Sequence, residues 1–434
     1  MNRYISFLYI GVCFFILSCS KSSNGDGGGN STTLSVTGFS PSSGKENSVV
    51  TITGSGFGTD ESLISISFNG SLPAIINSIT NTQLVVEVPV SAATGKLQVG
   101  KVATSSTLPV SSANDFTVVS SYTQMPDFGG GLRNLATALT IGNKAYVGLG
   151  SDGVNSYKLD WWAFDPATNA WTRKADFPGS GRVGASAFAV ANKGYVCFGS
   201  DANGFPKDVW EYDPASDKWT QKKNFEGLGR SGAFSFSSSD KGYVVSGFNG
   251  VSGSNYYYGK DVWEYNASSD TWTQKNDFPG NGRTQGFNFT ISGTTYVGGG
   301  FSKNNIGQAI ESVDLYSYNS ANDSWTSKTG LGLMGYANSA VSVNDKGHVL
   351  TGYSTNDFGI AGSNLLIYTS QAFTYDPTTD KWKRASYFPG SPRSSAIGFS
   401  VAGRGFVGIG YGSNNGSGND PHLFKDVWEF SPAE

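Results

Sequence analysis

Hydrophobic and polar residues alternate along most of this chain in short runs, and Gly, Pro, Ser, Asn or Asp separates one run from the next. Residues 49–53 (Val-Val-Thr-Ile-Thr) and 83–88 (Gln-Leu-Val-Val-Glu-Val) are typical runs. An alternation of period two predicts a β-strand with one buried face, and the separating residues are those that favour turns. The pattern therefore predicts an all-β protein.

The first group of runs lies between residues 33 and 119. About six or seven short strands in such a length predict one small immunoglobulin-like sandwich. Residues 39–44 (Phe-Ser-Pro-Ser-Ser-Gly) and 50–58 (Val-Thr-Ile-Thr-Gly-Ser-Gly-Phe-Gly) resemble the IPT/TIG family in wording and order. This resemblance implies a domain that serves as a spacer or as an accessory binding module.

Residues 121–434 consist of a sequence unit that repeats about every 50 residues. Each complete unit predicts four strands, a to d, and four antiparallel strands at this spacing form a propeller blade. The order Arg…Tyr-Val-x-x-Gly…Tyr-Asp-Pro…Trp resembles the kelch family, and six such units predict a six-bladed propeller. The strand b markers are Tyr146, Tyr195, Tyr243, Tyr296, His348 and Phe406, and the strand d markers are Trp171, Trp219, Trp272, Trp325 and Trp382.

The last unit ends at Glu434 without a strand d. Residues 122–128 (Tyr-Thr-Gln-Met-Pro-Asp-Phe) align with residues 272–278 (Trp-Thr-Gln-Lys-Asn-Asp-Phe), which begin with a strand d. We therefore expect the N-terminal strand of the propeller to complete the last blade. Such a closure would also protect the edges of the ring.

The N-terminus has the pattern of an export signal. Residues 1–18 combine Arg3 with an apolar run too short to span a bilayer. Ile-Leu-Ser-Cys at 16–19 resembles the lipobox of bacterial lipoproteins, which implies lipidation of Cys19. Residues 19–32 are rich in Gly and Ser and predict a flexible tether. We expect a protein anchored to the cell envelope, at the surface of the outer membrane, through the lipid alone; a plain secretory signal is the alternative.

Composition argues against several classes of partner and cofactor. The net charge is −3 and no basic block occurs, which argues against nucleic acid as a partner. Three cysteines and two histidines provide neither a disulfide framework nor a zinc motif. The copper oxidases among kelch propellers need two His, two Tyr and a Cys, a set that His348, His422 and Cys197 do not match in position. We expect no cofactor or metal, a buried Cys197 and a monomer.

The loops between strands b and c vary most in length, as binding loops on a rigid scaffold do. They carry aromatic residues beside Asn, Asp and Ser, which suits stacking on sugar rings and hydrogen bonding to hydroxyls. Loops with aromatics packed on their own scaffold are the alternative. The candidates are Tyr256, Tyr257, Tyr258, Tyr353, Phe358, Tyr368 and Tyr411.

A ring of arginines begins strand a, each 13 residues before the strand b marker. These guanidinium groups either clamp a ligand carboxylate or pair with the Asp that begins strand c. Blade 5 lacks both members, with Gly335 or Tyr336 in place of Arg and Gln371 in place of Asp. The joint loss favours a structural ion pair. The arginines are Arg133, Arg182, Arg230, Arg283 and Arg393, and the aspartates are Asp160, Asp208, Asp261, Asp314 and Asp426.

The sequence favours a non-catalytic surface protein that binds a glycan on the face formed by the d–a and b–c loops. Two alternatives stay open. One is a platform for protein interaction or adhesion. The other is a kelch enzyme resembling the sugar mutarotases or epimerases, which would need an acid–base residue and an arginine clamp.

Overall fold

The computed structural model describes residues 33–102, 108–153, 156–252, 255–332, 335–354, 367–414 and 421–433. In these residues every element except the 3-10 turn η1 (Glu61–Leu63) is a β-strand, so the all-β prediction is confirmed. None of the described helices is long and apolar enough to cross a membrane. The expected signal peptide (1–18), the lipidation site Cys19, the tether (19–32) and the candidate Phe358 lie outside the described residues.

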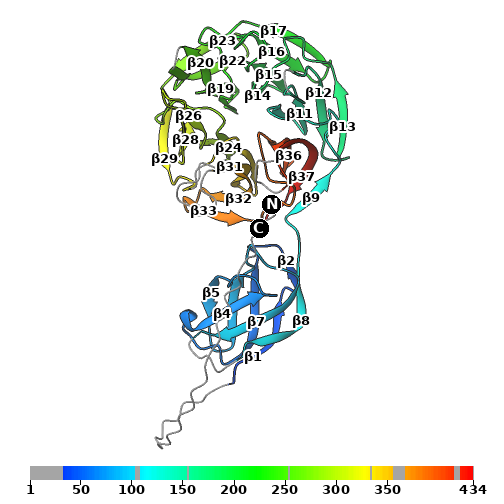
Figure 1. The fold of residues 1–434 in the computed structure, drawn as a ribbon, viewed down its shortest axis with the longest axis vertical. Coiled ribbons are helices and arrows are strands. Elements are labelled where there is room, and N and C mark those ends of the chain that lie inside the picture. The colour runs from blue at the N-terminus through cyan, green and yellow to red at the C-terminus, as the bar shows by residue number, and fades with distance from the viewer. Residues whose placement is uncertain are drawn as a thin grey trace, which may run out of the picture.

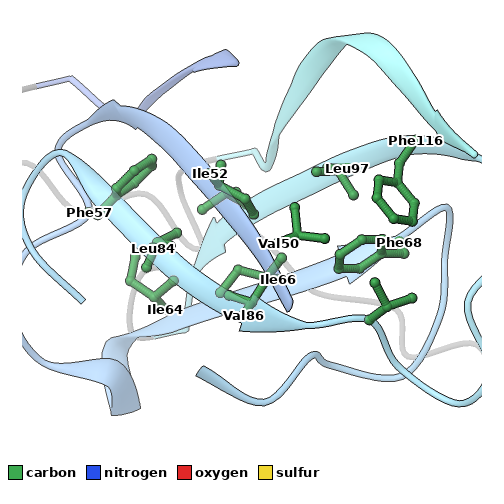
Figure 2. Packing of buried hydrophobic residues seen from close by; sticks show 12 residues of the cluster. Val50, Ile52, Phe57, Ile64, Ile66, Phe68, Leu84, Val86, Leu97 and Phe116 are labelled. Carbon is green, nitrogen blue, oxygen red and sulfur yellow. The ribbon is translucent and has the colours of Figure 1, made fainter. Parts of the chain in front are cut away.

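The N-terminal domain is a sandwich of two four-stranded sheets, as the sequence predicts. Alternate residues of each strand point between the sheets, where Ile52, Ile66 and Phe116 are fully buried. Figure 2 shows how these side chains interdigitate in one apolar core. One sheet has the order β1 (Ser35–Ser40), β3 (Val49–Ser55), β6 (Gln83–Glu87), β5 (Ile76–Ile79), and the other β2 (Ser43–Gly44), β8 (Val110–Val118), β7 (Gly95–Lys101), β4 (Ile64–Phe68).

The rest of the described chain forms six sheets arranged around a central axis (Figure 1). Strand a of each blade lies innermost and contacts strand a of both neighbouring blades. Blades 1 to 3 are β10 (Thr137–Ile141), β11 (Lys144–Gly148), β12 (Trp161–Asp165), β13 (Ala170–Lys174); β14 (Ser186–Val190), β15 (Lys193–Cys197), β16 (Val209–Asp213), β17 (Lys218–Lys222); and β18 (Phe234–Ser238), β19 (Lys241–Val245), β22 (Val262–Asn266), β23 (Thr271–Lys275).

The later blades carry longer strands or extra ribbons. The b–c connections of blades 3 and 4 form two-stranded ribbons, β20 (Phe248–Ser252) with β21 (Asn255–Tyr258) and β26 (Phe301–Lys303) with β27 (Ala309–Glu311). Blades 4 to 6 are β24 (Phe287–Ile291), β25 (Thr294–Gly298), β28 (Leu315–Asn319), β29 (Ser324–Lys328); β30 (Ser339–Val343), β31 (Lys346–Ser354), β32 (Ile367–Asp376), β33 (Lys381–Ala385); and β34 (Arg393–Ser394) with β35 (Ile397–Val401), β36 (Arg404–Gly412), β37 (His422–Phe430), β9 (Tyr122–Met125).

The predicted closure is confirmed. Strand β9, from the start of the propeller, pairs antiparallel with β37 at its end, with Tyr122 opposite Phe430 and Met125 opposite Val427. The Tyr122 ring lies 4.9 Å from the ring of Phe430, and its hydroxyl donates to the carbonyl of Ser386. The first and last segments of the propeller therefore share one sheet.

Aromatic contacts join each blade to the next. The strand b marker of every blade packs against an aromatic residue in strand c of the following blade. His348 takes part through Phe430, with its ring nitrogens bonded to Thr374 and to the carbonyl of Val343. Cys197 is fully buried, as expected, and burial raises the pKa of its thiol.

The sandwich contacts the propeller at the rim formed by blades 5 and 6, below β33 and β9 in Figure 1. Lys45 Nζ donates to Ser431 Oγ at 2.6 Å, and Asn47 Nδ2 donates to the carbonyl of Arg384 at 3.2 Å. Lys383 also forms an ion pair with Glu87 of the sandwich. The propeller side of these contacts is thus strand β33 and the residues that follow β37.

Candidate functional site

The loop face of the propeller is the face that carries the d–a loops and the b–c connections, including both ribbons. Three structures compose it: a ring of buried ion pairs, a run of aromatic side chains over blades 4 to 6, and a collar of hydrogen bonds around the central channel.

The arginine at the start of strand a pairs with the aspartate at the start of strand c in five blades, as favoured from the sequence. Arg182 is typical: it donates to both carboxylate oxygens of Asp208 at 2.6 and 2.8 Å. The five arginines are at most 1% exposed. They are therefore not available as a ligand clamp, which corrects their place among the binding candidates. The pairs are Arg133–Asp160, Arg182–Asp208, Arg230–Asp261, Arg283–Asp314 and Arg393–Asp426.

Each ion pair belongs to a larger cluster. Arg182 also donates to the carbonyl of Phe198, at the end of strand b, and its guanidinium lies 4.9 Å from the ring centre of Phe177. Trp210 Nε1 donates to the same carboxylate. Burial alone would raise the pKa of Asp208, but the hydrogen bonds and charge of Arg182 outweigh it and lower that pKa. Every blade except blade 5 repeats the Phe, the Arg and the Asp.

In blade 5, other residues occupy the positions of this cluster. Its Tyr336 pairs with Tyr353 as the residue after each arginine pairs in the other blades, so Gly335 takes the arginine position. Asn338, three residues later, donates through Nδ2 to the carbonyl of Thr351 at 2.7 Å, the bond that an arginine makes elsewhere. The other blades have Ala or Gly at the place of Asn338: Ala136, Ala185, Ala233, Gly286 and Ala396. Leu331, Gln371 and Phe373 complete the exchange in blade 5.

Beside this exchange the aromatic run crosses blades 4 to 6. It consists of Phe301, Tyr336, Tyr353, Tyr368 and Tyr411, whose successive ring centres lie 4.4, 5.1, 4.8 and 6.0 Å apart. The Tyr353 hydroxyl donates to that of Tyr368 at 3.2 Å. Tyr336 and Tyr368 are buried, whereas Tyr353 and Tyr411 are half-buried. Three of the sequence candidates thus come together, with two rings that the sequence did not single out.

A carboxylate lies beside the run. Glu311 is half-buried and pairs with Phe301 across the β26–β27 ribbon, so both side chains lie on one face of it. Burial, the neighbouring Tyr353 and the charge of Glu311 together raise the pKa of Tyr336 to about 12. Burial and the hydrogen bond with Tyr353 raise the pKa of Tyr368. Both phenols are therefore protonated at neutral pH and carry a proton that can be donated in a hydrogen bond.

The three tyrosines of the blade 3 ribbon do not act as one group. The Tyr256 ring lies 5.2 Å from Lys303 Nζ of the blade 4 ribbon. The Tyr258 ring packs on Phe248, at 5.2 Å. Tyr257 is half exposed. Tyr256 and Tyr258 therefore hold the ribbons in place, and Tyr257 alone of the three presents its ring to solvent.

A closed ring of backbone hydrogen bonds surrounds the channel mouth. One residue of each d–a loop donates its N–H to the carbonyl of its counterpart in the preceding blade. Backbones bonded in this way lie about 4.8 Å apart, so a regular ring of six has a radius of about 5 Å at the backbone. This is too narrow for a sugar to pass. The collar consists of Leu135, Gly184, Gly232, Gln285, Ala337 and Ser395.

Inside the channel the innermost strands line a cavity of about 320 Å³. Its wall is rich in hydroxyl groups, and these bond the exposed edges of the strands; Thr140 Oγ1, for example, donates to the carbonyl of Ser400. Among the described residues no group of three or more His, Cys, Asp or Glu side chains is placed to hold a metal ion. The aromatic run with Glu311, which combines aromatic rings with a carboxylate, is thus the candidate site.

Comparison with known proteins supports the architecture. Residues 34–118 match the IPT/TIG domain family, and residues 125–258 match the N-acetylneuraminate epimerase family. The chain also has 70% of its length in common with a solved structure titled "Structure of YjhT", at a TM-score of 0.58 and 16% identity, and covers 95% of that chain. At this identity the likeness shows the fold alone.

Several curated relatives are named N-acetylneuraminate epimerase. The chain is 28% identical over 183 residues to one from Haemophilus influenzae (strain PittEE), covering 36% of this chain and 47% of that protein. It is 29% identical over 164 residues to one from Shigella sonnei (strain Ss046), covering 32% and 44%. The chain thus spans about half the length of these relatives. The family match ends within the blade 3 ribbon, so the aromatic run lies beyond it.

Proposed function

We propose that the propeller binds an acidic, N-acylated sugar on its loop face and interconverts the anomers of that sugar. The observation that carries the proposal is the aromatic run with the half-buried Glu311 beside it. Stacked rings contact the apolar face of a sugar, and a carboxylate transfers protons. The local similarity to proteins named N-acetylneuraminate epimerase supports this assignment and makes N-acetylneuraminate the first substrate to test.

Anomer interconversion needs no cofactor. A base removes the proton of the anomeric hydroxyl, the bond between the anomeric carbon and the ring oxygen breaks, and the ring oxygen takes up a proton. The open carbonyl form then turns, and the reverse transfers close the ring on the other face. We assign the proton transfer to the Glu311 carboxylate and hydrogen-bond donation to the phenol of Tyr336, which its raised pKa keeps protonated.

Magnetisation-transfer NMR between the two anomers of N-acetylneuraminate tests this directly. The purified protein should raise the exchange rate above that of buffer, and Glu311→Gln should lower the catalysed rate at least tenfold. Asp115→Asn, which changes an exposed carboxylate of the sandwich, is the matched control and should leave the rate unchanged. Exchange at the buffer rate in the presence of the wild-type protein would refute the proposed activity.

A glycan receptor without catalysis is the second candidate. The sequestration of all five arginines in ion pairs favours it, because an acidic substrate then lacks the guanidinium clamp expected of an enzyme. Saturation-transfer difference NMR separates the two functions. Sugar signals without faster anomer exchange would identify a receptor.

We further propose that the protein is exported and anchored through a lipid on Cys19, with the sandwich as a spacer below the propeller. The lipobox resemblance at residues 16–19 supports this location. Cys19→Ser should move the protein from the membrane fraction to the soluble fraction. Equal membrane association of both forms would refute lipid anchoring at this residue.

A further inference from the structure

Blade 5 differs from the other blades at five positions. Where the others have Phe, Arg, Ala or Gly, Asp, and Trp or Tyr, blade 5 has Leu331, Gly335, Asn338, Gln371 and Phe373. The exchange removes a guanidinium and its carboxylate together. We propose that blade 5 is the ligand-binding blade and that Asn338 and Thr351 accept hydrogen bonds from a neutral donor of the sugar, a hydroxyl or an amide N–H. This inference rests on the proposed function and deepens it.

Two buried oxygen atoms of blade 5 have no hydrogen-bond partner among the described residues. Asn338 uses its Nδ2 on the carbonyl of Thr351, which leaves Oδ1 buried and without a hydrogen-bond partner among the described residues. The Thr351 hydroxyl has no such partner there either, and the residue is only 1% exposed. A buried polar atom left unpaired costs about 1–3 kcal/mol. Asn338 and Thr351 lie side by side in space, so their two unpaired oxygen atoms fit a place that a ligand completes.

Gly335 stands where five blades have a buried arginine side chain. A Cβ on Gly335 would meet the carbonyl oxygen of Tyr353 at 2.8 Å, and Asn338 Nδ2 and Oδ1 at 3.6 and 3.8 Å. The position that an arginine occupies elsewhere is thus next to the amide that carries the unpaired acceptor.

Tyr336 follows Gly335 directly, and Tyr353 comes two residues after Thr351, so the rings of the aromatic run lie next to the acceptors. A sugar whose apolar face stacks on these rings would direct a hydroxyl or an amide N–H toward Asn338 and Thr351. The Asn338 Oδ1 atom only accepts hydrogen bonds and repels a carboxylate, so the acid group of an acidic sugar would face away from it. The site therefore recognises the neutral donors of the sugar.

The test removes one acceptor without changing shape. Thr351→Val should weaken the binding of N-acetylneuraminate, measured by saturation-transfer difference NMR, at least tenfold, while the melting temperature stays the same or rises. The matched control is Thr137→Val, which alters a buried hydroxyl in strand a of blade 1 that is already bonded to the carbonyl of Ala185. That control should lower the melting temperature and leave sugar binding unchanged.

A second variant rebuilds the missing cluster. Gly335→Arg/Asn338→Ala/Gln371→Asp gives blade 5 the residues of its neighbours and should abolish sugar binding in a protein that still folds. If the wild-type protein binds the sugar and both variants bind it equally well, the acceptors hold only water and the blade 5 assignment falls, while the proposed function stands. If the wild-type protein binds no N-acylated sugar, both proposals fall.

Discussion

The N–H of Leu135 donates to the carbonyl of Ser395 at 3.3 Å and thereby links blade 1 to blade 6. This bond is the last of the six in the collar. The ring of blades is therefore closed twice, by the collar around the channel mouth and by the pairing of β9 with β37 at the outer edge. Because loops are more precise when their scaffold is rigid, this double closure helps to fix the rings of the aromatic run in place.

Removing the ring that anchors the outer closure should destabilise the propeller. Tyr122→Ala deletes a buried ring in contact with Phe430 and Phe388, and we expect a loss of about 3–5 kcal/mol in the free energy of unfolding. Urea denaturation followed by tryptophan fluorescence measures it. Thr123→Ala, on the exposed side of the same strand, is the control and should change the free energy by less than about 0.5 kcal/mol. Equal effects of the two would contradict a closure that depends on Tyr122.

The buried ion pairs should matter far more for stability than surface pairs do. Arg182→Ala leaves the carboxylate of Asp208 and the carbonyl of Phe198 without their donor, so we expect a loss of about 3 kcal/mol in the free energy of unfolding. The exposed pair Arg173–Asp176 is the comparison, and Arg173→Ala should cost less than about 1 kcal/mol. Similar losses in urea denaturation would show that the burial of Arg182 does not increase the contribution of its ion pair to stability.

Much of the fold followed from local signals. The spacing from Tyr122 to Phe128 equals that from Trp272 to Phe278, and this alone predicted the closing strand. The pairing of Arg with Asp followed from their joint absence in blade 5, since a change at one partner of a buried ion pair removes the reason for the other. A repeated sequence allows equivalent positions to be compared within one chain, and both features could be predicted for that reason.

The candidate site was harder to predict, for physical reasons. Phe301 and Tyr411 are far apart in the chain, and only the closed ring of blades brings them into one run with Tyr353. The faces of Tyr256, Tyr257 and Tyr258 depend on how the β20–β21 ribbon pairs, which a short run does not specify. Asn338 stands out in the sequence, since Ala or Gly occupies its place in the other blades. Its hydrogen-bond partner, the carbonyl of Thr351, could be identified only from the structure.

Substitutions of the ribbon tyrosines should differ in their effect on the melting temperature. Tyr258→Ala removes a ring that packs on Phe248, so we expect a lower melting temperature and greater susceptibility of the ribbon to proteolysis. Tyr257→Ala removes an exposed ring and should leave the melting temperature unchanged. Limited proteolysis with mass spectrometry locates the cut. A destabilised Tyr257→Ala protein would mean that this ring is part of the packing.

His348 should make the propeller sensitive to mild acid. Burial lowers the pKa of this histidine from 6.5 to about 4, and the folded protein therefore keeps its imidazole neutral, bonded to Thr374 and Val343. The unfolded chain takes up a proton below about pH 6.5, whereas the folded chain does so only near pH 4. The free energy of unfolding is thus unaffected above pH 6.5 and falls as the pH drops, by about 2 kcal/mol between pH 7 and pH 5.

The comparison variant for this pH dependence is His348→Phe, because Phe406 stands at the same strand b position in blade 6. Urea denaturation measures the free energy of unfolding of both proteins at pH 7 and pH 5. The difference between wild type and variant should be smaller at pH 5 than at pH 7, or reversed. Tyr296→Phe changes the corresponding residue of blade 4, which does not titrate in this range, and should run parallel to the wild type. If His348→Phe also ran parallel to the wild type, the imidazole would have to be solvated or charged in the folded protein. The packing of blade 5 against blade 6 would then be looser than its contact with Phe430 implies.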